Sequence, residues 1–353
     1  MNTHPYSNAE HWRVWRRAVA NPAPADVDPV VAFPFRISPE DRVVTAGSCF
    51  AQHIARHLRS RGFNYLIAEP AHKLLDRHTA EIFNYGIYSA RYGNIYSARQ
   101  LLQLFQRAYG MFVPLEAPWE EAGALFDPFR PLIQPGGFAS RAEFKVDQEQ
   151  HFAAVRRAFR ELDVFVFTLG LTECWESTLD GAVFPICPGT SHGQFNSNLY
   201  ALRNLSVEEN IADLRQFITL LHRTNPSARV MLTVSPVPLI ATAEATHVLA
   251  ATTYSKSVLR VAAEIVSKID HVAYFPSYEI ITGAYARGHY FGEDCRSVTE
   301  AGVEHVMRIF FRHATSNPAE RDSVPTEVEQ RSFDGGRGIV QVICEEESHD
   351  QPL

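Results

Sequence analysis

The feature that most constrains the fold is a repeated alternation of short apolar segments with longer segments of helical periodicity. Four mainly apolar runs of strand length occur at residues 43–46, 164–169, 230–234 and 272–275. Runs that are apolar on both faces are typical of parallel strands covered by helices on both sides. Helical spacing follows the first run in Phe50, Ile54 and Leu58. The alternation predicts a three-layer α/β/α sandwich with a mainly parallel sheet. Such sheets bind ligands at the carboxyl ends of their strands.

The sequence also indicates where the domain begins and ends. Residues 1–40 are rich in Pro and Trp and read as an N-terminal extension, whereas residues 41–315 carry the α/β pattern. Residues 70–150 interrupt that pattern and are interpreted as an insertion, with one clear helix at 98–109. Residues 316–353 hold nine acidic residues and three arginines. Low apolar content and high charge predict a flexible tail, for which an interaction role stays open.

Composition excludes several classes of protein. Of the net charge of −7, the tail carries −6, so the remaining 315 residues are nearly neutral and offer no basic surface for nucleic acid. No apolar run reaches 18 residues, and the first 20 residues lack the apolar stretch of a secretory signal. We therefore expect no membrane span and a cytoplasmic protein. The five cysteines form no C-x-x-C pair and no G-x-G-x-x-G is present, so neither a metal nor a cofactor is expected.

The first chemical motif centres on Ser48, which follows the predicted strand 43–46 and precedes a predicted helix. The free N–H groups and positive dipole end of a helix N-terminus stabilise an oxyanion beside a nucleophile. Serine is also a favoured N-cap, so a purely structural role for Ser48 is the alternative. The surrounding residues do not match the motif G-x-S-x-G, so the nucleophile elbow of α/β-hydrolases is not supported.

The string Gly47-Ser48-Cys49-Phe50-Ala51 resembles the motif that gives the GSCFA family its name. Segments that resemble the same family follow in family order at residues 92–96, 168–170, 233–237, 255–256 and 274–279. The resemblance spans about residues 43–310. It implies membership of the SGNH, or GDSL-like, hydrolases, with a flavodoxin-like α/β/α sandwich. The implied chemistry is hydrolysis or O-acyl transfer of an acyl (acetyl) ester, on a small molecule or a carbohydrate such as a bacterial surface polysaccharide.

The resemblance also assigns roles to residues in the first three sequence blocks. It makes Ser48 the nucleophile, and it forms the oxyanion hole from the amides of Ser48 and Gly93 together with side chains at Asn94 and Thr172. Thr172 stands where the superfamily has asparagine in Gly-x-Asn-Asp. A threonine hydroxyl is shorter than that amide, and losing one oxyanion donor costs about 2.7–4 kcal/mol.

The last block departs further from the superfamily pattern, Asp-x-x-His. Here Asp294 is followed three residues later by Ser297, which accepts no proton at neutral pH. We interpret Ser297 and Glu300 instead as a capping box that opens the last helix. Three alternatives follow: another histidine is the base, Asp294 acts on Ser48 directly, or the chain only binds a ligand. The candidate bases, in order, are His247, His192 and His289, since imidazole titrates near neutrality.

Three further side chains are expected to bind substrate, namely Lys256, Glu173 and His192. Lys256 suits a phosphate or carboxylate, and its alternative is a solvated lysine in the first turn of a helix. Together these patterns predict a serine esterase or O-acyltransferase. The competing hypothesis is a non-catalytic binding protein on the same scaffold, in which Ser48 caps a helix whose N-terminus holds an anion.

Overall fold

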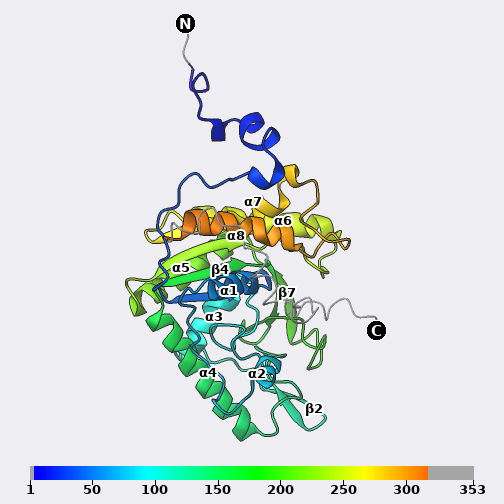
Figure 1. Ribbon diagram of the computed structural model, residues 1–353. Coiled ribbons are helices and arrows are strands. Elements are labelled where there is room, and N and C mark those ends of the chain that lie inside the picture. Colours follow the sequence, from blue (N-terminus) through cyan, green and yellow to red (C-terminus); the bar gives the residue numbers. More distant parts are fainter. Residues whose placement is uncertain (1–3, 317–353) are drawn as a thin grey trace. The chain divides into compact units, whose positions relative to one another are not determined.

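The computed structural model describes residues 4–316, which divide into two compact units (Figure 1). One unit consists of residues 40–274, and the other combines residues 4–39 with residues 275–316. The predicted tail lies outside the described residues, Ser316 excepted. Within the described part of the chain, no helix is both long and apolar enough to span a membrane.

The central sheet has the order β1-β4-β8-β9 and contains every strand expected from the apolar runs. Its strands are β1 (Val43–Gly47), β4 (Val164–Leu169), β8 (Arg229–Val234) and β9 (Val272–Phe275). β4 pairs in parallel with both β1 and β8. All six residues of β4 are buried, as two covered faces require. The prediction of an α/β fold with a mainly parallel sheet flanked by helices is confirmed.

The edge of the sheet beside β1 locates the point where a ligand is expected. Tyr65 forms a parallel bridge with Val43, and Leu66 donates its N–H to the Val43 carbonyl at 2.9 Å. This segment therefore extends the sheet beyond β1, which gives the strand order 2-1-3-4-5 of flavodoxin-like folds. In such sheets the strand order reverses between the first and third strands, and the crevice there is the usual ligand site. In this chain that switch point lies between β1 and β4.

Helices follow three of the strands as the alternation predicts, whereas two helices of this unit, at residues 77–82 and 141–161, were not expected. The helices of this unit are α1 (Phe50–Ser60), α2 (Arg77–Ile82), α3 (Ala98–Ala108), α4 (Arg141–Glu161), α5 (Val207–Thr224) and α6 (Val248–Val266). A capping box opens α5, with Ser206 and Glu209 each bonded to the other's backbone N–H. The helix expected at 98–109 is α3, one residue shorter.

Five short strands lie outside the parallel sheet and were not expected. β2 (Trp119–Glu121) and β3 (Ala124–Phe126) form a hairpin. A second antiparallel sheet has the order β6-β5-β7, with β5 (Glu173–Ser177), β6 (Val183–Phe184) and β7 (Tyr200–Asn204). Of the residues after Gly170, Thr172 directly precedes β5 and Glu173 is its first residue. Polar and apolar residues do not alternate regularly in these strands, so the sequence lacks the two-residue period that indicates a strand.

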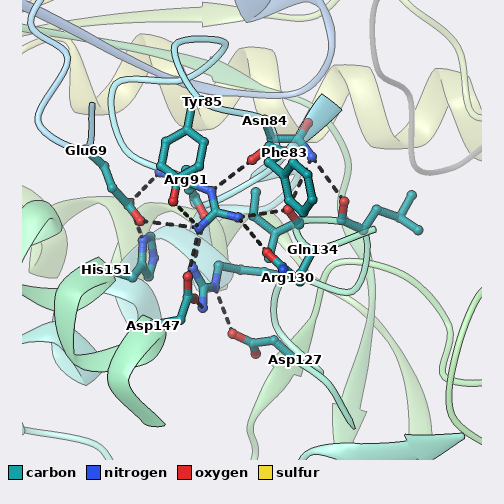
Figure 2. A network of polar contacts seen from close by, with 12 residues as sticks. Glu69, Phe83, Asn84, Tyr85, Arg91, Asp127, Arg130, Gln134, Asp147 and His151 are labelled. Carbon is teal, nitrogen blue, oxygen red and sulfur yellow. Dashed lines mark hydrogen bonds and ion pairs between the residues drawn. The ribbon is translucent and has the colours of Figure 1, made fainter. Parts of the chain in front are cut away.

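The insertion is held by a buried network of charges (Figure 2). The guanidinium of Arg91 donates to Asp147 Oδ1 at 2.8 Å and to the Ile133 carbonyl at 3.0 Å, and its side chain is only 2% exposed. Arg130 donates to the other oxygen of Asp147 at 2.6 Å and to Asp127 at 2.7 Å. The network therefore ties the start of α4 to two separate loops of the insertion.

A histidine and a glutamate complete this network. Glu69 accepts the Arg91 backbone N–H at 2.7 Å and lies 2.8 Å from His151 Nδ1. Although burial raises the pKa of Glu69, its contact with His151, the charge of Arg130 and the Arg91 N–H together bring that pKa down to about 2. Glu69 therefore stays ionised at neutral pH. The residue lies just before the insertion, so the cluster anchors both ends of this segment.

The second unit pairs an N-terminal segment with the last helix. Ile37 and Thr315 form a parallel bridge, and His313 Nε2 lies 2.7 Å from the Asp28 carboxylate. Its helical segments are η1 (His11–Arg13), η2 (Arg16–Ala20), η3 (Pro24–Asp26), α7 (Ser277–Thr282), η4 (Ala284–Ala286) and α8 (Glu300–Ala314). The predicted capping box at Ser297 is wrong, because Thr299 is the N-cap of α8 and accepts the Gly302 N–H.

Gly47 at the end of β1 allows the close approach of β1 and β4. A Cβ at this position would lie 2.4 Å from the Thr168 carbonyl oxygen and 2.7 Å from Thr168 Cβ, with φ at +141°. Overpacking and backbone strain each cost about 1–3 kcal/mol. We therefore expect Gly47→Ala to lower the free energy of unfolding by about 3 kcal/mol in urea denaturation. Gly62→Ala, also at positive φ but with open space around it, is the control. Equal losses in both variants would contradict the packing argument.

Candidate functional site

Three segments of the larger unit meet at the switch point between β1 and β4. The first is the turn from Gly47 into α1, and the second begins with Gly170 after β4. The third, residues 92–96, joins them: Ile95 donates its N–H to the Gly47 carbonyl at 2.9 Å, and Gly170 donates to the Tyr96 carbonyl at 3.0 Å. Residues from three distant parts of the sequence therefore surround Ser48.

Ser48 lies inside this junction and is only 4% exposed. Its N–H donates to the Thr168 carbonyl at 3.2 Å. Its hydroxyl is fully buried and has no hydrogen-bond partner among the described residues. A Cβ added to Gly170 would lie 3.1 Å from Ser48 Cβ, so Gly170 packs directly on the serine. A nucleophile has to reach its substrate, yet in this structure the Ser48 hydroxyl does not open into a cleft.

The helix-cap alternative for Ser48 is wrong as well. Cys49 is the N-cap of α1, and no side chain caps this helix. The Ser48 hydroxyl therefore has no structural hydrogen bond to explain its presence. Leaving a buried hydroxyl unpaired costs about 1–3 kcal/mol, so such groups in a native structure call for a functional or solvent explanation.

The expected oxyanion residues lie nearby, but two of their side chains are engaged elsewhere. Gly93 has φ at +72°, a conformation that suits glycine. Asn94 is buried, and its Oδ1 accepts from Gln52 Nε2 of α1 at 3.2 Å. The Thr172 hydroxyl donates to Asn204 Oδ1 at 2.7 Å. In this arrangement the Thr172 hydroxyl proton is directed away from Ser48.

None of the proposed histidine bases is hydrogen bonded to Ser48 in this structure. His247 is exposed and serves as the N-cap of α6, where Nδ1 accepts the Leu249 N–H at 3.1 Å. His192 Nδ1 lies 3.0 Å from Glu121 Oε2, and its ring stacks on Phe126 with centroids 3.6 Å apart. His289 is exposed and belongs to the other unit.

The Asp294 carboxylate binds its own turn. It accepts the Ser297 hydroxyl at 2.5 Å and the N–H groups of Arg296 and Ser297 at 3.0 Å. The Ser297 hydroxyl is the chief cause of a lowered Asp294 pKa. Ser297 thus takes up the carboxylate that a histidine would use in the superfamily motif, so this turn is stable without one.

The structure contradicts the alternative interpretation of Lys256, because this lysine is neither solvated nor in a first turn. It lies in the middle of α6, is 1% exposed, and donates from Nζ to the Gly170 carbonyl at 2.7 Å. Its neighbour Ser255 accepts the Thr172 N–H at 3.0 Å. These two residues of α6 fix residues 170–172, the segment that packs on Ser48.

Glu173 borders a cavity of about 220 Å³ next to this segment. Its carboxylate accepts the Thr242 hydroxyl at 2.7 Å, and burial raises its pKa. The loop after β8, residues 239–243, forms the opposite wall. Sequence analysis missed this loop, although its position after a parallel strand was a usable signal. Of the substrate-binding candidates, Glu173 is the one that lines the cavity.

Comparison with known proteins places the whole site within one family. A model of the GSCFA family matches residues 42–310, about three quarters of the chain. The chain belongs to the GSCFA family. No curated protein matches the sequence. The GSCFA match includes Ser48, Gly93, Asn94, Thr172 and Lys256, so every segment at the switch point lies inside the GSCFA region. Within the part of the chain that is described, no group of three potential metal ligands occurs.

Proposed function

We propose that this GSCFA protein is a serine ester hydrolase or O-acyltransferase of the SGNH, or GDSL-like, type, with Ser48 as its nucleophile. Its substrate is an acyl ester of a small molecule or a carbohydrate, such as a bacterial polysaccharide precursor in the cytoplasm. The observation that carries the proposal is the unpaired Ser48 hydroxyl at the switch point of the sheet. A buried hydroxyl without a structural hydrogen bond calls for a functional explanation, and a nucleophile provides one.

The geometry supports a nucleophile at position 48 in two ways. The residue directly precedes the N-cap of α1, so the positive end of the helix dipole lies beside it. Gly170 packs on its Cβ, and any side chain at position 170 would close this space. Small residues and free N–H groups around a serine are what a tetrahedral oxyanion needs.

In the proposed mechanism, Ser48 Oγ attacks the ester carbonyl and the alcohol leaves, which forms an acyl-enzyme. Water or a sugar hydroxyl then takes the acyl group and restores the serine. The proposed oxyanion donors are the N–H of Gly93 and the N–H of Ser48, which in this structure donates to the Thr168 carbonyl at 3.2 Å and has to be released first. Because the Ser48 side chain is buried, the segments around it have to move apart to admit an ester. The proton that Ser48 loses ends on the leaving alcohol, and the attacking water or sugar hydroxyl returns a proton to Ser48 in the second step.

A first test is hydrolysis of aryl esters such as p-nitrophenyl acetate and p-nitrophenyl hexanoate by the full-length protein. We expect turnover that Ser48→Ala abolishes. Turnover that survives in Ser48→Ala would assign the activity to another residue, and no turnover of any ester would refute a hydrolase.

A second function is favoured by two observations, the burial of Ser48 and the engagement of Asp294 by Ser297. Under this proposal the protein binds an ester or acyl ligand without cleaving it. It predicts ligand binding that Ser48→Ala leaves intact, together with the absence of any covalent adduct on Ser48.

A further inference from the structure

The cavity beside Glu173 is large enough to hold part of a substrate. Its volume is about 220 Å³, and its walls come from the start of β5, from residues 185–190, and from the loop 239–243. An apolar cavity of about 150 Å³ already binds benzene in another protein. This cavity therefore has room for a group of about six or more carbon atoms.

The lining of the cavity selects an uncharged, apolar group. Leu171, Ile186 and Leu239 contribute aliphatic surface. Burial raises the pKa of the Cys174 thiol to about 12 and that of Cys187 to about 11, so both thiols are neutral. The Glu173 carboxylate already accepts the Thr242 hydroxyl at 2.7 Å. No cationic side chain lines the cavity among the described residues, which argues against a phosphate or a carboxylate.

One chain segment both lines the cavity and contacts Ser48. Leu171 lines the cavity, and the preceding residue, Gly170, packs on Ser48 Cβ. The N–H groups of both residues donate to the Tyr96 carbonyl at 3.0 Å. The cavity therefore begins one residue from the contact on Ser48, and an acyl chain bound at Ser48 would reach it once the contact between Gly170 and Ser48 opens.

We propose that this cavity is the acyl-chain site of the enzyme and that it takes an aliphatic acyl group of about six carbons. This inference rests on the proposed function, and it replaces acetyl with a longer chain as the preferred acyl group. Full burial of each added methylene is worth a factor of about three to four in binding. Hexanoyl, with four methylenes more than acetyl, gains at least tenfold even with partial burial.

The test compares kcat/KM for p-nitrophenyl esters from acetate to decanoate in the full-length protein. The wild type is expected to prefer hexanoate over acetate by at least tenfold. Ala241→Trp places a large ring in the cavity wall and should lower the hexanoate-to-acetate ratio at least tenfold. Ala250→Trp, at an exposed position of α6, is the matched control and should keep the wild-type ratio. A wild-type preference for acetate, or an unchanged ratio in Ala241→Trp, would overturn the inference.

A binding measurement separates failure of this inference from failure of the proposed function. Hexanamide, an uncharged analogue that needs no catalysis, is titrated into Ser48→Ala and into Ser48→Ala/Ala241→Trp by calorimetry. Binding to the first that is lost in the second supports the acyl-chain site even if no ester is hydrolysed. Equal binding to both, or binding to neither, refutes the site whatever the esterase assays give.

Discussion

Replacing Arg91 with methionine is expected to lower the free energy of unfolding by about 3–5 kcal/mol. The guanidinium is fully buried and donates to Asp147, to the carbonyls of Phe83 and Ile133, and to Gln134 Oε1. Methionine fills similar volume but leaves a buried carboxylate and two carbonyls without these donors. Removing one partner of a buried ion pair costs this much because the other charge stays desolvated.

Arg77→Met provides the matched control for this prediction. Arg77 pairs with Glu81 at 2.8 Å on the surface of α2, where its side chain is 91% exposed. Exposed pairs of this spacing contribute about 0.3–0.5 kcal/mol. Urea denaturation of both variants measures the difference. A loss below 1 kcal/mol for Arg91→Met would show that the network in Figure 2 does not hold the insertion.

The strand pattern made the sheet predictable from the sequence. The positions of the buried charged side chains were not predictable in this way. Mainly apolar runs identified β4 and β8 because parallel strands are buried on both faces. The burial of Lys256 could not be predicted, because the charge of a lysine almost always keeps it on the surface. Its hydrogen bond to the Gly170 carbonyl depends on the packing of α6 against the end of β4.

The sequence predicted where the site lies. It did not predict which contacts the residues of the site make. Ser48 was placed at the end of a buried strand and before a helix, and it lies there. Its burial, and the use of Thr172 by Asn204, depend on partners more than 30 residues away. The cavity walls come from β5, from residues 185–190 and from the loop after β8, so no single sequence motif marks them.

Ser48→Ala is expected to abolish esterase activity, with kcat/KM falling at least a thousandfold, while stability stays equal or rises. The activity falls because the nucleophile is removed. Stability does not fall because the lost hydroxyl is buried and makes no hydrogen bond. Ser191→Ala removes another buried hydroxyl without a partner among the described residues and should leave both properties unchanged. Loss of stability in Ser48→Ala would instead assign the serine a structural role.

The most direct test of the central claim is covalent labelling of the full-length protein with a fluorophosphonate, with the modified peptide located by mass spectrometry. The account predicts one phosphonyl group, bonded to Ser48 Oγ, whose formation Ser48→Ala prevents and Ser191→Ala does not. Labelling at a different residue, or no labelling under conditions that modify a known serine esterase, would contradict Ser48 as the nucleophile.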